Sequence, residues 1–222
     1  MNEGGFCLAA THVFSKDEEL ANAITHGIGA LISIACLTLL IVFASLYGNV
    51  WHIVSFSIYG TSMLILYASS TLVHSFPPGK AKDLFEILDH SAIYLFIAGT
   101  YTPILFIVVQ GVLGWTLFGI IWGIATLGIV FKIFFVKKFL VISTVFYLLM
   151  GWMAMFAIKP IVMTLPLQGT LFLIGGGVLY SLGTVFYIWR GFKFHHAVWH
   201  LFVLGGTILH FFLVIKYILP IQ

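Results

Sequence analysis

Residues 112–131 read VLGWTLFGIIWGIATLGIVF, twenty consecutive residues that include no charged side chain. A helix needs about 20 apolar residues to cross the hydrocarbon core of a bilayer. A strand of a transmembrane barrel would be about half as long and would alternate apolar with polar side chains, as this run does not. The sequence therefore predicts a membrane-spanning helix here.

Three similar apolar runs precede it in the sequence and three follow it. Of the 222 residues, 61% are hydrophobic and 8% are charged. A soluble globular protein is excluded because such proteins have roughly a quarter charged residues. We predict an all-α integral membrane protein, a seven-transmembrane-helix bundle, with residues 1–20 as a short polar tail and residues 21–222 as the transmembrane domain. The expected spans are residues 27–47, 52–76, 90–110, 112–131, 139–158, 168–189 and 196–217.

The distribution of basic residues predicts the orientation. Cytoplasmic connections collect Lys and Arg, and one side of the predicted bundle holds all of them except Lys159 and Lys216. We therefore expect a cytoplasmic N-terminus and an outside C-terminus. The net charge of +3 is modest and the basic residues are dispersed, so nucleic acid is not an expected partner. The cytoplasmic set is Lys16, Lys80, Lys82, Lys132, Lys137, Lys138, Arg190 and Lys193.

Polar residues at the predicted cytoplasmic ends of three spans form a candidate site. His196 and His200 are four residues apart and share one helix face, as do Ser70 and His74. Asp89 adjoins the third apolar run, where a bare charge is least expected. The predicted topology places these residues at one membrane depth, so they are expected to converge.

Three imidazoles with one open position are a common catalytic shell for zinc (Zn²⁺). We interpret His74, His196 and His200 as metal ligands. Asp89 would accept a proton from the attacking water or orient it, and Ser70 would donate to that water or to an oxyanion. Alternatives remain open: the histidines can serve packing alone, Asp89 can cap the third span, and another transition metal can occupy the site.

Other polar residues favour structural roles. We expect His26 and His90 at the cytoplasmic interface, His52 at the outer interface, and His195 facing away from His196. His210 lies deep in the last run and needs a polar partner, such as Thr207 or a facing Ser or Tyr. The segment 101–103 is expected to kink its helix at the proline.

Five motifs together resemble the hemolysin III family, the bacterial relatives of the progestin and adipoQ receptors. The resemblance covers roughly residues 18–215. It implies zinc ligands at His74, His196 and His200, an aspartate at Asp89 that holds the zinc-bound water, and a matching serine at Ser70. It also implies the orientation predicted from the loop charges and a place in the bacterial inner membrane. The motifs are Glu19-Leu-Ala-Asn-Ala-Ile-Thr-His26-Gly, Ser70-Thr-Leu-Val-His74, Leu88-Asp89-His90-Ser91, Ala98-Gly-Thr-Tyr-Thr-Pro103 and His196-Ala-Val-Trp-His200.

Three functions follow as hypotheses. The first is a zinc-dependent, ceramidase-like hydrolase of lipid amides or esters in membrane lipid homeostasis. The second is a pore-forming or hemolytic protein, as the family name suggests, although the fourth to sixth runs offer few polar residues to line a pore. The third is a non-catalytic lipid sensor in which zinc joins two spans. The expected partners are membrane lipids, a divalent metal and, as an open alternative, further copies of the chain.

Overall fold

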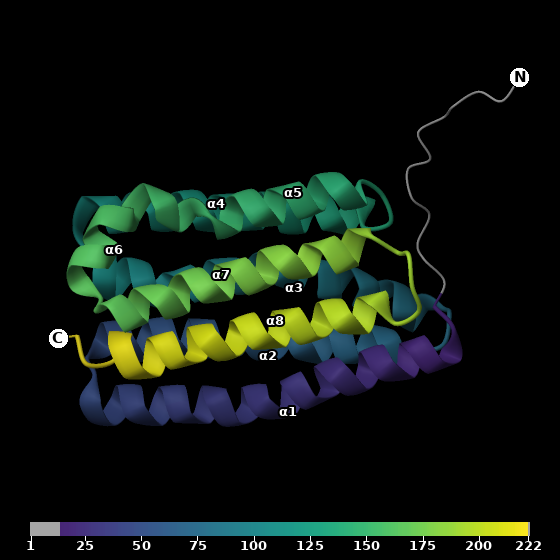
Figure 1. Cartoon of the computed structure of the whole chain (residues 1–222), viewed down its shortest axis with the longest axis horizontal. Helices are drawn as coiled ribbons and strands as arrows, with labels where there is room; N and C mark the ends of the chain where they lie inside the picture. The colour runs from purple at the N-terminus through teal and green to yellow at the C-terminus, as the bar shows by residue number, and fades with distance from the viewer. Residues whose placement is uncertain (1–13, 222) are drawn as a thin grey trace, which may run out of the picture.

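The structure is a computed structural model that describes residues 14–221, and it confirms the predicted seven-helix bundle. Seven helical segments are long and apolar enough to cross a membrane, and they pack side by side with the N- and C-terminal ends at opposite ends of the bundle (Figure 1). The elements are α1 Lys16–Tyr47, α2 Val50–Ser75, α3 Lys80–Pro103, η1 Ile104–Val109, α4 Gly111–Phe135, α5 Leu140–Gly151, η2 Met153–Ala157, α6 Ile158–Thr164, α7 Leu167–Ile188, α8 His195–Leu213 and η3 Val214–Ile218.

Two helices begin well before their apolar runs. Ser15 caps α1 in a capping box, in which its hydroxyl accepts from the Glu18 amide and the Glu18 carboxylate accepts from the Ser15 amide at 2.9 Å. The first helix therefore starts inside the segment expected to be a polar tail. The third helix starts at Lys80, so Asp89 lies in its third turn and is not an N-cap. Both extensions carry polar residues into the bundle.

The fifth span differs from the continuous helix that was expected. It consists of α5, the 3₁₀ segment η2 and α6. The hydroxyl of Tyr101 donates to the carbonyl of Gly151 and accepts from the amide of Ala154 at 2.9 Å. These bonds satisfy backbone groups that the break leaves without a helical partner, a requirement inside a membrane. At Pro103, where a kink was expected, the helix changes from α to π.

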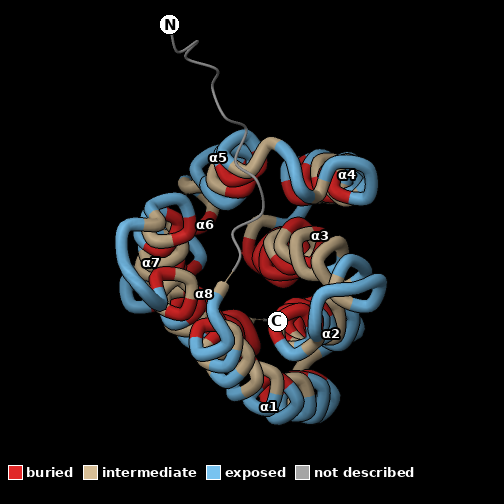
Figure 2. Tube along the Cα trace, turned by 90° about the vertical axis from the view of Figure 1, so that its right-hand side faces the viewer, coloured by how far each residue is buried: buried red, intermediate tan, exposed pale blue. Residues whose placement is uncertain are grey.

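The bundle exposes large apolar side chains and buries many polar ones beside its hydrophobic core. Large aliphatic side chains such as Leu31, Leu127 and Met163 are exposed, whereas Ser, Thr and His side chains are buried between the helices. Figure 2 shows the buried positions facing inward, with α1 between α2 and α8. This arrangement suits a lipid solvent, since polar groups must find partners within the protein.

We predict that Gly114→Ala destabilises the protein. A Cβ atom at Gly114 would lie 2.5 Å from the carbonyl oxygen of Leu105, a backbone atom that cannot rotate away. Overpacking of this kind costs about 1–3 kcal/mol. Thermal unfolding in detergent should show a lower midpoint for Gly114→Ala. The matched control on the same helix is Gly123→Ala, which has open space around the new methyl group; an equal loss in both variants would contradict the packing explanation.

Candidate metal site

The three predicted metal ligands lie together. His74 ends α2, and His196 and His200 occupy the first two turns of α8. Their ring centroids are 5.1 Å apart for His74 and His196, 5.4 Å for His74 and His200, and 4.5 Å for His196 and His200. One nitrogen from each ring lies within 4.8 Å of the other two. The i, i+4 spacing and the shared bundle end thus produce the expected convergence.

Glu19 of α1 orients the His74 ring. The Nδ1 atom of His74 lies 2.6 Å from Glu19 Oε2, and Lys82 Nζ donates to Glu19 Oε1 at 2.6 Å. Because a carboxylate only accepts hydrogen bonds, Nδ1 must carry the proton and Nε2 keeps its lone pair. A carboxylate on the far nitrogen is the usual support of a metal-bound histidine.

Thr25, also on α1, orients His200 in the same way. The hydroxyl of Thr25 lies 3.0 Å from Nδ1 of His200 and 2.9 Å from the backbone carbonyls of Ala21 and Asn22. Its single proton goes to a backbone carbonyl, so its oxygen accepts from the Nδ1–H of His200. The Nε2 atom of His200 is then also free to act as a ligand.

The donor set fits a divalent transition metal. Nε2 of His74 is buried and has no hydrogen-bond partner among residues 14–221, as expected for an atom reserved for a metal. Three neutral imidazoles suit zinc and several related ions. The carboxylates of Glu19 and Asp89 both interact with His74 and can offset the charge of a cation. His74, His196 and His200 would therefore hold the ion.

Asp89 and Ser70 lie beside these ligands. The Asp89 side chain is only 15% exposed, and it interacts with His74 and with the Ser70 hydroxyl. Ser70 is buried, and its Oγ lies 2.6 Å from Nδ1 of His26. The structure thus brings all five predicted site residues to one end of the bundle.

Sequence reasoning missed the contribution of α1. His26, expected at the cytoplasmic interface, is 3% exposed and stacks on His200. Glu19 and Thr25 were not considered as site residues. The spacing of Glu19, Asn22 and His26, at intervals of three and four, places them on one helix face and was the available signal. All three precede the first expected span, residues 27–47, and hydropathy therefore did not place them in the interior of the bundle.

The polar partner of His210 differs from those expected, and His90 has two partners that the sequence did not indicate. His90 donates from Nδ1 to the carbonyl of Glu86 at 2.8 Å, so its Nε2 accepts from the Tyr187 hydroxyl at 3.1 Å. His210 donates from Nε2 to the backbone carbonyl of Leu173 at 3.0 Å and not to a hydroxyl side chain. His90 is therefore held by one bond within α3 and one to α7, and His210 is held by a bond from α8 to α7.

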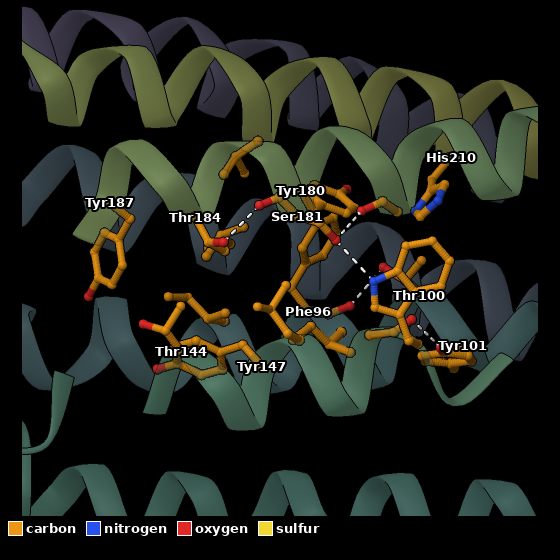
Figure 3. Close-up of a pocket in the computed structure, with 18 of the residues that line it drawn as sticks. Phe96, Thr100, Tyr101, Thr144, Tyr147, Tyr180, Ser181, Thr184, Tyr187 and His210 are labelled. Atoms are coloured by element: carbon orange, nitrogen blue, oxygen red, sulfur yellow. Dashed lines mark hydrogen bonds between the residues drawn. The ribbon is translucent and has the colours of Figure 1, made fainter. Parts of the chain in front are cut away.

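The site lies between two pockets, of which the one nearer the end of the bundle is the more polar. A narrow apolar pocket of about 140 Å³ runs between α3, α5, α7 and α8, and a wider polar vestibule of about 890 Å³ opens at the end of the bundle near the α2–α3 connection. Figure 3 shows the apolar pocket, with Tyr187 at one end and His210 at the other. Asp89, Tyr187 and His196 line both pockets. The candidate site is therefore reachable from both sides.

Comparison with known proteins shows that the chain is similar to members of one family. A family model described as haemolysin-III related matches residues 14–211. The "Hemolysin-3 homolog" of Bacillus subtilis is 57% identical over 92% of this chain and 96% of its own length. The "Hemolysin-3" of Bacillus cereus is 55% identical over 91% and 93%. The human "Monocyte to macrophage differentiation factor" is 31% identical over 90% and 84%.

We predict about one zinc ion per purified chain, as expected for a three-histidine shell. His196→Gln should lower the metal content to near zero, because it removes one of three ligands. Elemental analysis after dialysis measures this. His195→Gln is the control, since the neighbouring His195 binds the Phe186 carbonyl and lies outside the ligand group. Equal zinc content in both variants would contradict the ligand assignment.

We also predict that Glu19→Gln lowers zinc affinity by roughly 10–100-fold, the usual effect of losing a group that orients a metal-bound histidine. Competition with a fluorescent chelator measures the affinity. Asp83→Asn removes an exposed carboxylate at the same end of the bundle, where it pairs with Lys137. Loss of affinity in this control as well would indicate a general effect of charge and not a specific support of His74.

Proposed function

The chain belongs to the haemolysin-III family, and on that premise we propose that it is a zinc-dependent membrane hydrolase of lipid amides or esters. The observation that carries the proposal is the position of the histidine cluster between an apolar pocket and a polar vestibule. An amphiphilic lipid can place an acyl chain in the first and its polar part in the second. Its amide or ester bond then lies beside the candidate metal ligands and Asp89.

The dimensions of the apolar pocket favour a slender substrate. Its lining is almost entirely apolar, and its small volume suits a single extended chain better than a ring system. Aromatic and aliphatic side chains such as Phe96, Ile97 and Leu173 provide the walls. The pocket therefore supports a lipid with at least one unbranched acyl chain.

The residues of the site can carry out the proton transfers of hydrolysis. A zinc ion held by the three histidines would supply a Lewis acid that polarises the carbonyl group of the lipid. Asp89 lies where it can accept a proton from the attacking water and return it to the leaving amine or alcohol. The Ser70 hydroxyl, beside Asp89, is the group that would donate to the attacking water or to an oxyanion. Water and lipid are thereby converted into a carboxylic acid and an amine or alcohol.

We place the site in the cytoplasmic leaflet of the bacterial inner membrane. The end of the bundle that holds the histidine cluster also carries Lys16, Lys82, Lys137 and Arg190, which line the vestibule. An excess of basic residues favours a cytoplasmic location. The polar product would then leave toward the cytoplasm.

We predict that Asp89→Asn abolishes turnover while zinc content stays near that of the unmodified protein. The amide cannot accept the proton of the attacking water, and loss of a general base typically costs about 10²–10⁴-fold in rate. Zinc-loaded protein in mixed micelles should be assayed by mass spectrometry against a panel of ceramides, other acyl amides and acyl esters. Asp83→Asn, which changes an exposed carboxylate, should retain activity. If the zinc-loaded wild-type protein leaves the whole panel unchanged, the hydrolase proposal is wrong.

A structural role for the metal is the second candidate, because one observation favours it. The cluster joins α2 to α8, two helices that lie on either side of α1 (Figure 2). An ion there would tie them together without chemistry. This role is supported if zinc raises the melting temperature and the same preparation shows no lipid turnover.

A further inference from the structure

We propose that His26 is a positioning residue that holds both halves of the site, the metal ligand His200 and the Ser70–Asp89 pair. The part concerning Ser70 and Asp89 rests on the proposed hydrolase function, whereas the part concerning His200 requires only that the cluster binds a metal. His26 lies on α1, which supplies no ligand of its own. It acts through its contacts with α2 and α8.

The first contact is a parallel stack. The rings of His26 and His200 are 3.4 Å apart between centroids, with an interplanar angle of 14°. Thr25 holds the edge of the same His200 ring through Nδ1. Two neighbouring residues of α1 thus restrain His200 from its edge and from its face. A ring held in both ways cannot rotate about its last side-chain bond, so its Nε2 atom keeps its direction toward the other ligands.

The second contact is a hydrogen bond with a defined direction. In the proposed arrangement, the Ser70 hydroxyl gives its one proton to the neighbouring Asp89 carboxylate, which can only accept. The oxygen of Ser70 must then accept from Nδ1 of His26, which lies 2.6 Å away. The proposed order of donors is His26 to Ser70 to Asp89. His26 therefore determines which way the Ser70 hydroxyl points.

The surroundings of His26 exclude a simple role in filling space. Its ring is buried, its face covers His200, and its edge meets the ring of Tyr67 at 4.9 Å and 87°. Its Nε2 atom is buried without a hydrogen-bond partner among the described residues. A phenylalanine would fill the same volume without that unpaired polar atom. The bond between Nδ1 and Ser70 therefore explains why this position holds a histidine and not a phenylalanine.

Two substitutions separate the contacts. His26→Phe keeps an aromatic face against His200 but removes the donor to Ser70. His26→Asn keeps a nitrogen donor near the position of Nδ1 but removes the ring. Tyr67→Phe is the control for loss of a buried hydrogen bond nearby, because the Tyr67 hydroxyl donates to Thr207 and not to the site.

We expect the two variants to fail in different assays. Loss of a group that supports a metal ligand usually lowers metal affinity by about 10–100-fold. We expect His26→Asn to lower zinc affinity by roughly 10-fold or more. It should also shift the visible absorption spectrum of the cobalt-substituted protein. His26→Phe should keep both properties and lose turnover through kcat with little change in KM. Tyr67→Phe should resemble the wild-type protein in all of these measurements.

The outcomes decide the proposal. It is overturned if His26→Phe and His26→Asn change zinc affinity and kcat by equal factors, or if neither variant changes either quantity. Melting temperatures of all variants identify unfolding. If the wild-type protein hydrolyses no lipid, the hydrolase function fails separately, and the His26–Ser70 half is then decided by ¹⁵N-histidine NMR. In that experiment Nδ1 of His26 should be protonated, and its signal should shift in Ser70→Ala; an unprotonated Nδ1 would contradict the proposed order of donors.

Discussion

The structure depends on one constraint, that polar groups in a hydrocarbon solvent must be satisfied within the protein. The bundle meets it by turning aliphatic side chains outward and collecting Ser, Thr, Tyr and His inside. Even a break in the fifth span is covered, because the Tyr101 hydroxyl bonds the backbone on both sides of it. Against this background, polar atoms that remain buried and unpaired stand out. Nε2 of His74 and Nε2 of His26 are two of them and lie at the candidate site, whereas others, such as the Tyr59 hydroxyl, lie elsewhere in the bundle.

The first helix organises the site without contributing a ligand. Glu19 orients His74, Thr25 orients His200, and His26 contacts both His200 and Ser70. These residues lie within two turns of one helix, which packs between the two helices that carry the candidate ligands. The site is thus a three-helix assembly in which α1 sets the directions of groups on α2 and α8. A shift of α1 along its axis by one residue would break all of these contacts together.

The sequence predicts some parts of this arrangement better than others. Long uncharged runs define the number of spans, and the i, i+4 pairs Ser70–His74 and His196–His200 indicate shared helix faces. The role of Glu19, Thr25 and His26 was not predicted, because hydropathy ends a span where polar residues begin. The helix itself continues to the Ser15 cap. The break between α5 and α6 was also missed, since it depends on a tertiary contact with Tyr101 that no local pattern reveals.

The balance of charge explains why the cluster lies at the end of the bundle and not at its centre. A divalent cation would add two positive charges, and Glu19 and Asp89 together supply two negative ones. Lys82 adds a further positive charge through its 2.6 Å contact with Glu19. Placing this group of charges in the middle of the hydrocarbon would cost much free energy, because ions there lack hydration. Next to the polar vestibule, Glu19 and Lys82 stay partly exposed, at 22% and 24% of their side chains. Water can then screen the outer part of the network, while His74, His200 and Ser70 remain buried.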